Sequence, residues 1–282
     1  MEVILAKNAG FCFGVERAID QVYEQIKTGE QIYTFGPIVH NETVIRDLEE
    51  RGVRVIADED ELKEVSGGIM IIRAHGVAKR IYELLEQNGI AAVDATCPFV
   101  KKIHRTVEKE SANGKQIIII GSEDHPEVQG IIGWCENGAT VIRTPEEAKA
   151  YKAEDGAQIC LVSQTTFNHN KFQELVEIIS KKGYDINVAN TICNATQERQ
   201  EETARLAEQV DAMIVIGGMH SSNTRKLYDI CKERCEHTFF VQTADDLNSE
   251  VLKGFSKIGI TAGASTPNKL IEEVQNNVRF NF

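Results

Sequence analysis

The chain has 282 residues, with 31 Lys and Arg against 43 Asp and Glu, which gives a formal net charge of −12. With 42% hydrophobic residues and only 5 prolines it can bury a large core, which excludes disordered and collagen-like classes. No apolar run reaches the roughly 18 residues of a membrane span, and the N-terminal segment lacks a basic leader and a cleavage site. The acidic balance disfavours nucleic-acid binding. We therefore expect a mature chain that begins at Met1, stays in the cytoplasm, and binds small molecules or proteins, with no nucleic-acid and no membrane partner.

Short β-branched runs alternate along the chain with amphipathic helical patterns, which is typical of α/β units with parallel strands. The strong strand candidates are, in chain order, residues 32–35, 69–72, 117–120, 159–162, 213–216 and 258–261. A weaker strand-like run lies inside each successive pair, at residues 53–56, 140–142 and 238–241. The order strong, weak, strong therefore occurs three times.

The cysteines follow the same period. There are seven, at positions 12, 97, 135, 160, 193, 231 and 235, with no CxxC pair, so a disulfide framework or a zinc ribbon is not expected. Cys12, Cys97 and Cys193 are separated by steps of 85 and 96 residues. The glycines that follow the first strong strand of each set obey the same steps, at positions 36, 121 and 217.

This agreement predicts a threefold internal repeat with one thiol per repeat. The predicted fold is three similar α/β domains with mostly parallel sheets around a pseudo-threefold axis. The predicted domains are residues 1–97, 98–193 and 194–282, the last with a C-terminal tail.

Three thiolates from three domains could hold an iron–sulfur cluster, because soft thiolates select such clusters. A four-iron cluster with three cysteine ligands leaves one iron open, as a catalytic zinc keeps one position open. Three unrelated buried thiols remain an alternative, since an unpaired cysteine is often simply buried. The other four cysteines are interpreted as packing residues: Cys135, Cys160, Cys231 and Cys235.

Polar residues gather in the loops that follow the predicted strands, where open α/β sheets bind ligands. A set of donors suits a phosphate or diphosphate: His40, His75, Ser221, Ser222, Asn223 and Ser265. His125 and Glu127 could deliver a proton, with Glu127 as the acid, and Thr165 or Thr166 could pass it on or hold a substrate hydroxyl. Two alternatives stay open: helix capping by residues 221–223, and surface positions for the histidines.

Nine motifs in order extend this pattern over the whole chain: AGFCFGV, GPIVHN, RAHGV, DATCPFV, GSEDHPEVQG, SQTT, TICNATQERQ, GGMHSSNT and TAGASTP. With them, the chain closely resembles the 4-hydroxy-3-methylbut-2-enyl diphosphate reductase family of the non-mevalonate isoprenoid route. The resemblance implies three α/β domains around a central cluster held by Cys12, Cys97 and Cys193. It implies Glu127 as the proton donor and Thr165 beside the substrate hydroxyl. It implies diphosphate contacts from His40, His75, His125, Ser221, Ser222, Asn223 and Ser265.

The resemblance also implies a 4Fe-4S cluster with one open iron, which oxidation would convert to 3Fe-4S. The open iron would receive the allylic hydroxyl while Glu127 protonates the departing oxygen. Two electrons from a reduced ferredoxin or flavodoxin, with two protons, would give isopentenyl or dimethylallyl diphosphate. Two other functions stay open: a different three-cysteine cluster enzyme, such as a quinolinate-synthase-like lyase or a hydratase, and a non-catalytic diphosphate-binding or iron-sensing module.

Overall fold

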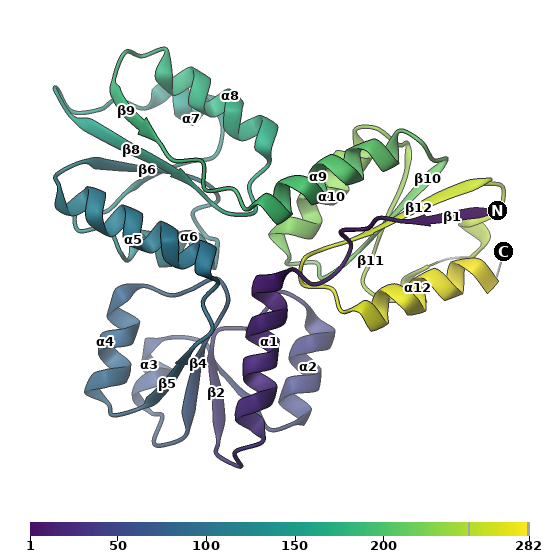
Figure 1. The fold of residues 1–282 in the computed structure, drawn as a ribbon, viewed down its shortest axis with the longest axis horizontal. Helices are drawn as coiled ribbons and strands as arrows, with labels where there is room; N and C mark the ends of the chain where they lie inside the picture. The colour runs from purple at the N-terminus through teal and green to yellow at the C-terminus, as the bar shows by residue number, and fades with distance from the viewer. Residues whose placement is uncertain (248, 281–282) are drawn as a thin grey trace. The chain divides into compact units, whose positions relative to one another are not determined.

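The computed structural model describes residues 1–247 and 249–280, and it contains three four-stranded sheets (Figure 1). Every strand pair in them is parallel. The first sheet has the order β3-β2-β4-β5, the second β7-β6-β8-β9, and the third β11-β10-β12-β1. The prediction of three similar α/β domains with parallel sheets is confirmed.

The strands of the first sheet are β2 (Ile32–Phe35), β3 (Arg54–Ile56), β4 (Ile69–Ile72) and β5 (Ala91–Asp94). Those of the second are β6 (Gln116–Ile120), β7 (Thr140–Ile142), β8 (Gln158–Ser163) and β9 (Asp185–Val188). Those of the third are β1 (Glu2–Leu5), β10 (Ala212–Ile216), β11 (His237–Val241) and β12 (Lys257–Ala262). All nine predicted strands are present, so the repeated order of strong, weak and strong runs is confirmed.

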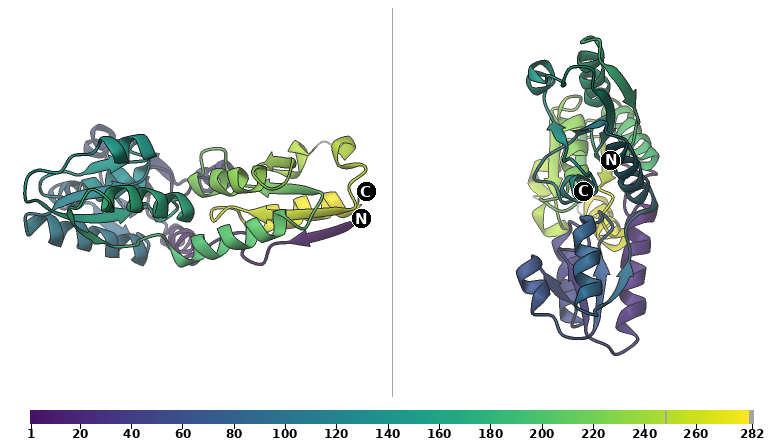
Figure 2. Two further views of the ribbon diagram at one scale, coloured as in Figure 1. Left: turned by 90° about the horizontal axis from the view of Figure 1, so that it is seen from above. Right: turned by 90° about the vertical axis from the view of Figure 1, so that its left-hand side faces the viewer.

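The fourth strand of each sheet is not among the predicted strands. In the first two sheets it is the edge strand that precedes Cys97 or Cys193 in the chain, β5 or β9. In the third sheet it is β1, which pairs in register with β12, Val3 opposite Ile258. Figure 2 shows this purple first strand along the yellow last one. Residues 2–5 thus belong to the third sheet rather than the first. The predicted domain boundaries, after residues 97 and 193, stay a prediction.

Helices connect the strands. They are α1 (Phe13–Ile26), α2 (Glu42–Glu50), α3 (Glu59–Lys63), α4 (Lys79–Gln87), α5 (Pro98–Ala112), α6 (Pro126–Ile132), α7 (Pro145–Ala150), α8 (His169–Ser180), α9 (Asn194–Ala207), α10 (Ser222–Lys232), α11 (Ser249–Leu252) and α12 (Asn268–Phe280), with a short 3-10 turn at Ala244–Asp246. Within the described residues, no helix combines the length and the apolar character that crossing a membrane requires.

The chain forms two compact units. Unit 1 consists of Met1–Glu16, Val39–Leu48 and Asn194–Phe282, and it contains the third sheet. Unit 2 consists of Arg17–Ile38 and Glu49–Cys193, and it contains the first two sheets.

In each unit, helices cover both faces of a sheet because side chains alternate along every strand. In unit 1, Ile214 and Ile216 of β10 pack with Val274 of α12, whereas Met213 packs on the other face with Leu227 of α10. In unit 2, the second sheet packs one face against α8 and the other against α5 and α6. Helix α6, which carries Glu127, is therefore fixed to a buried sheet.

A buried histidine supports the loop that carries His75. His104 of α5 is 3% exposed, and its ring stacks on Trp134, with centroids 5.2 Å apart. The Trp134 Nε1–H group donates to the Val77 carbonyl at 2.9 Å. A Cβ atom at Gly76 would lie 2.5 Å from His104, and its φ of +71° also favours glycine. The RAHGV loop can therefore lie directly on the His104 ring.

This histidine gives a pH-dependent stability. Burial, the main cause, lowers the pKa of His104 from 6.5 to about 4. The unfolded chain takes up the proton near pH 6.5 and the folded chain only near pH 4, so this stabilisation is complete above about pH 6.5 and is lost as the pH falls towards 4. Between pH 6.5 and pH 4, we expect protonation of His104 to lower the free energy of unfolding by about 3 kcal/mol.

Urea unfolding followed by circular dichroism at a series of pH values measures this effect. His104→Gln should lose correspondingly less stability between neutral and acidic pH than the wild type. An identical pH dependence in both proteins would exclude this role for His104.

Candidate active site

The three cysteines of the repeat occupy equivalent positions. Cys97 is the N-cap residue of α5, and Cys12 and Cys193 directly precede α1 and α9. All three are partly exposed, and no disulfide joins any of the seven cysteines. A helix N-terminus favours the thiolate over the thiol, and the thiolate is the form that binds metal.

Backbone hydrogen bonds repeat with the cysteines. The amide of Cys12 donates to the Ala264 carbonyl at 3.2 Å, that of Cys97 to Ala74 at 3.0 Å, and that of Cys193 to Thr165 at 3.1 Å. These acceptors lie in the loops that follow β12, β4 and β8, which occupy the same place in the three sheets. The threefold repeat predicted from cysteine spacing is thus present in individual hydrogen bonds.

The other four cysteines are packing residues. Cys160, Cys231 and Cys235 are buried, and Cys135 packs on the buried cluster of the second sheet. Burial raises the pKa of the Cys135 and Cys231 thiols to about 12, which keeps them protonated at neutral pH. Thiols in this state are poor metal ligands.

A buried carboxylate is the most unusual feature of unit 2. Glu127 is 1% exposed and lies in the first turn of α6. Its Oε1 atom accepts the backbone N–H of Thr165 at 2.6 Å, and its Oε2 atom accepts the Thr165 hydroxyl at 2.7 Å. Thr166 instead accepts a hydrogen bond from Gln164 at 3.0 Å. Of the two candidate threonines, Thr165 is therefore the one that contacts the carboxylate.

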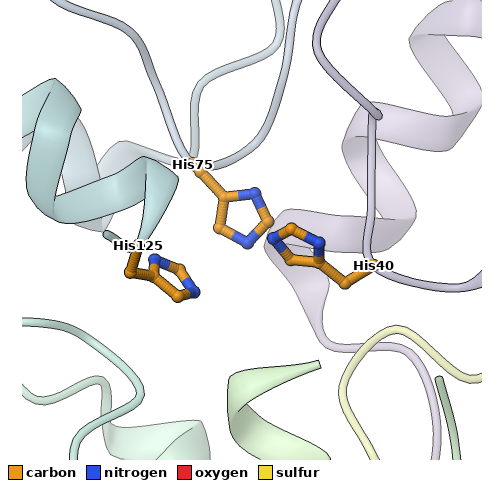
Figure 3. Close-up of side chains that lie close together, drawn as sticks. All are labelled: His40, His75 and His125. Atoms are coloured by element: carbon orange, nitrogen blue, oxygen red, sulfur yellow. The ribbon is translucent and has the colours of Figure 1, made fainter. Parts of the chain in front are cut away.

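Two histidines of unit 2 are linked to Glu127, His125 directly and His75 through its contact with His125. His125 is the N-cap of α6, and its Nδ1 atom accepts the Glu127 backbone N–H at 3.1 Å. The rings of His75 and His125 meet edge to face, with centroids 5.5 Å apart (Figure 3). Figure 3 also labels His40, a residue of unit 1. His75, His125, Glu127 and Thr165 thus form one polar cluster within unit 2.

Unit 1 brings together the other candidate residues. The Ser265 hydroxyl donates to the His40 carbonyl at 3.2 Å, and a Cβ atom at Gly218 would collide with the same carbonyl. Ser221 is the N-cap of α10, and its hydroxyl accepts the Thr224 N–H at 3.2 Å. Ser222 accepts a hydrogen bond from Lys226 at 2.7 Å. The predicted capping role is therefore present at Ser221, at a helix N-terminus that also favours an anion.

Asn223 is not explained by capping. Its side chain is 4% exposed, and neither its Oδ1 nor its Nδ2 atom has a hydrogen-bond partner among the described residues. An unpaired buried amide costs about 1–3 kcal/mol, so it calls for an explanation, and a bound ligand is one. The α10 N-terminus with Ser221 and Asn223 is named the cradle of unit 1, and the Asn223 amide there lacks the partners that an anionic ligand would provide.

Arg199 and Glu202 anchor the segment before Cys12 through contacts that were not predicted from the sequence. Arg199 of α9 is buried and donates to the carbonyls of Asn8 at 2.6 Å and Gly10 at 2.8 Å. Glu202 accepts the backbone N–H groups of Lys7 and Asn8 at 2.7 and 2.9 Å. Together they fix the segment that leads to Cys12 onto the helix that follows Cys193. The only signal was the helical spacing of two charged residues, Arg199 and Glu202, in QERQEE.

Fold and site together define an α/β protein of three repeated parallel sheets, with a cysteine at a helix start in each repeat. The family model described as LytB protein matches residues 3–279, and the chain belongs to this family. Its curated relatives include the 4-hydroxy-3-methylbut-2-enyl diphosphate reductase of Caldanaerobacter subterraneus subsp. tengcongensis, 47% identical over 99% of this chain and 97% of the relative. The enzyme of the same name from Clostridioides difficile is 44% identical over 97% of this chain and 98% of the relative.

Solved structures agree with the family. The E-1-hydroxy-2-methyl-but-2-enyl-4-diphosphate reductase of Plasmodium falciparum matches with a TM-score of 0.92 and 30% identity, over 99% of this chain and 87% of that one. A structure of (E)-4-hydroxy-3-methyl-but-2-enyl diphosphate reductase, described as the terminal enzyme of the non-mevalonate pathway, matches with a TM-score of 0.70 and 39% identity, over 99% of this chain and 100% of that one. The resemblance noted from the motifs, and the expectation of an enzyme of this reductase family, are confirmed.

Proposed function

We propose that this chain reduces 4-hydroxy-3-methylbut-2-enyl diphosphate to isopentenyl and dimethylallyl diphosphate. The reaction takes two electrons and two protons, breaks the allylic C–O bond and releases water. The observation that carries the proposal is the threefold repetition of a partly exposed cysteine at a helix start. The names of the curated relatives, which match nearly the whole chain, support the same substrate.

The proposed ligands of a 4Fe-4S cluster are Cys12, Cys97 and Cys193. We propose three domains, with boundaries after residues 97 and 193, that surround a common axis with the cluster at their centre. All three lie at equivalent helix starts and are partly exposed, and cysteine thiolates are the usual ligands of such clusters. When bound, the cluster supplies the electrons and a Lewis-acidic open iron, and loss of that iron on oxidation would leave 3Fe-4S. A reduced ferredoxin or flavodoxin is the proposed electron donor, and the cytoplasm the proposed compartment.

The diphosphate is held by side chains remote from the reacting carbon, so that its binding energy positions the allylic end. The proposed diphosphate contacts are His40, His75, His125, Ser221, Ser222, Asn223 and Ser265. Thr165 and Thr166 are proposed to bind the rest of the substrate, with Thr165 beside its hydroxyl. Asn223 supports this assignment most directly, because its buried amide has no partner within the described residues. The α10 N-terminus adds a favourable field for the negative charge.

Glu127 is the proposed proton donor to the departing oxygen, with His125 and Thr165 as the other catalytic residues. Burial and the paired contacts with Thr165 hold its carboxyl in one orientation. The Thr165 hydroxyl can pass a proton between this carboxyl and the substrate oxygen, because a hydroxyl both donates and accepts.

Removal of the Thr165 hydroxyl should slow turnover. Thr165→Val keeps the shape of the side chain but removes the hydrogen bond to Glu127 Oε2. A hydrogen bond to a charged group contributes about 1.5–3 kcal/mol, so we expect kcat to fall about 10- to 100-fold, with a smaller change in KM. Steady-state kinetics on wild type, Thr165→Val and Thr165→Ser measure this. Thr165→Ser should retain most activity, and a fully active valine variant would remove Thr165 from the mechanism.

Anaerobic turnover tests the proposed function. The chain with its cluster should convert the allylic diphosphate to both isoprenyl diphosphates when a low-potential reductant is present, and should stop without it. A quinolinate-synthase-like lyase or a hydratase would need no reductant. A non-catalytic binding or iron-sensing module would bind the diphosphate and convert none of it.

A further inference from the structure

Unit 2 contains a cavity to which the proposed reaction assigns no role. It has a volume of about 140 Å³ and lies between the ends of β2 and β4, the start of α4, and α6. Arg73, Arg80, Glu59 and Gln129 give it polar walls. This volume is several times the roughly 30 Å³ that one water molecule occupies, so the cavity has room for a small polyatomic ion.

Arg73 has little to compensate its charge. Its only hydrogen bond is a long one, from Nε to the Gly76 carbonyl at 3.5 Å, and it forms no ion pair with any residue that the structure describes. The guanidinium lies against Gly36, where a Cβ atom would collide with Nη1 and where φ is +68°. Because Gly36 has no side chain, the Arg73 guanidinium can lie against its backbone. This packing holds the guanidinium at the cavity wall.

Arg73 is half-buried but keeps its charge. Burial lowers its pKa to about 10, so the group is still protonated at neutral pH. Because the side chain is half-buried, its charge is only partly solvated, and charges in such places are commonly paired or bound to a ligand. The cavity beside Arg73 is the place where a counter-charge would be bound.

A second guanidinium lines the same cavity. Arg80 forms an ion pair with Glu59, and its side chain is 69% exposed. The three ionised groups, Arg73, Arg80 and Glu59, leave one net positive charge at the cavity. Because a guanidinium presents paired N–H donors in a planar fork, it suits bidentate contact with a phosphate.

We propose that this cavity binds the phosphate group of a small molecule, or inorganic phosphate itself, at a site distinct from the cradle at the α10 N-terminus of unit 1. Arg73 provides the main contact and Arg80 the second, whereas Glu59 competes with the ligand for Arg80. Arg73 lies two residues before His75, and the cavity wall includes Pro126, between His125 and Glu127. A bound phosphate therefore contacts both segments that carry the polar cluster of unit 2.

Titration calorimetry of the anaerobic holoprotein with inorganic phosphate tests this site. Saturable binding is expected in the wild type, at least about tenfold weaker in Arg73→Gln and severalfold weaker in Arg80→Gln. Glu59→Gln should bind phosphate severalfold tighter, because it removes a negative charge and releases Arg80. Glu59→Gln changes a partly exposed residue, so the test does not depend on how well the Arg73 variant folds.

Matched controls separate this site from the substrate site. Arg143→Gln, which removes an exposed arginine, and Asn223→Ala, which alters the cradle of unit 1, should both bind phosphate as the wild type does. Phosphate binding should also persist with saturating isopentenyl diphosphate. Absence of saturable binding, equal affinities in wild type and Glu59→Gln, or complete displacement by isopentenyl diphosphate would each overturn the proposal. Substrate turnover is measured separately, so these results do not depend on the proposed reaction.

Discussion

Replacement of Glu127 by Gln should lower the rate of substrate reduction by about 10²- to 10⁴-fold, the usual contribution of a positioned general acid. The amide keeps the size of the side chain and can still accept the Thr165 N–H through its oxygen. It cannot deliver the proton that the departing oxygen needs. Anaerobic steady-state kinetics, with iron content measured on the same samples, test this prediction.

The matched control is Glu123→Gln, an exposed carboxylate four residues earlier in the chain. It should leave the rate and the iron content unchanged. The Glu127→Gln variant should also retain its full iron content, because no cysteine is altered. Wild-type activity in Glu127→Gln would exclude Glu127 as the proton donor.

The second large effect concerns the cysteines. Cys12→Ser, Cys97→Ser and Cys193→Ser should each abolish the visible charge-transfer absorption and reduce activity to background. A serine hydroxyl is a poor ligand for iron beside thiolates, and two cysteines cannot hold a cluster that needs three. Iron and sulfide content per chain, measured anaerobically after reconstitution, give the readout.

Cys135→Ser is the control for the cysteine series. Cys135 is partly exposed like the three proposed ligands, and its thiol donates weakly to the Ile131 carbonyl at 3.5 Å, a contact that serine can replace. This variant should retain full iron content and activity. Unchanged iron content in any of the three ligand variants would remove that cysteine from the cluster.

Hydrophobic patterning predicted the buried strands, because a strand enclosed on both faces is a nearly continuous apolar run. The edge strands β5 and β9 escaped prediction because they are short and largely exposed, so they lack that run. The pairing of β1 with β12 joins segments more than 250 residues apart. Local sequence carries no signal for it.

At the candidate site, sequence could name residue types but not their partners. Thr165 and Thr166 are equivalent as neighbours in SQTT, and only the fold distinguishes them, because Thr165 lies against Glu127. Capping and ligand binding were alternatives for residues 221–223. Capping occurs at Ser221, whereas the buried Asn223 amide has no hydrogen-bond partner among the described residues, and its role in ligand binding stays a prediction. The contacts of Arg199 with Asn8 and Gly10 could not be predicted, since they depend on tertiary structure.

The most direct test of the central claim is an electron count. Wild-type holoprotein and Glu127→Gln are titrated anaerobically with a reduced one-electron dye, and substrate is then added. The wild type should consume two dye equivalents for each molecule of isopentenyl or dimethylallyl diphosphate formed, whereas Glu127→Gln should accept electrons into its cluster but form almost no product. Conversion of the substrate without electron consumption, or no conversion by a fully loaded wild type, would contradict the assignment of this chain as a cluster-dependent reductase.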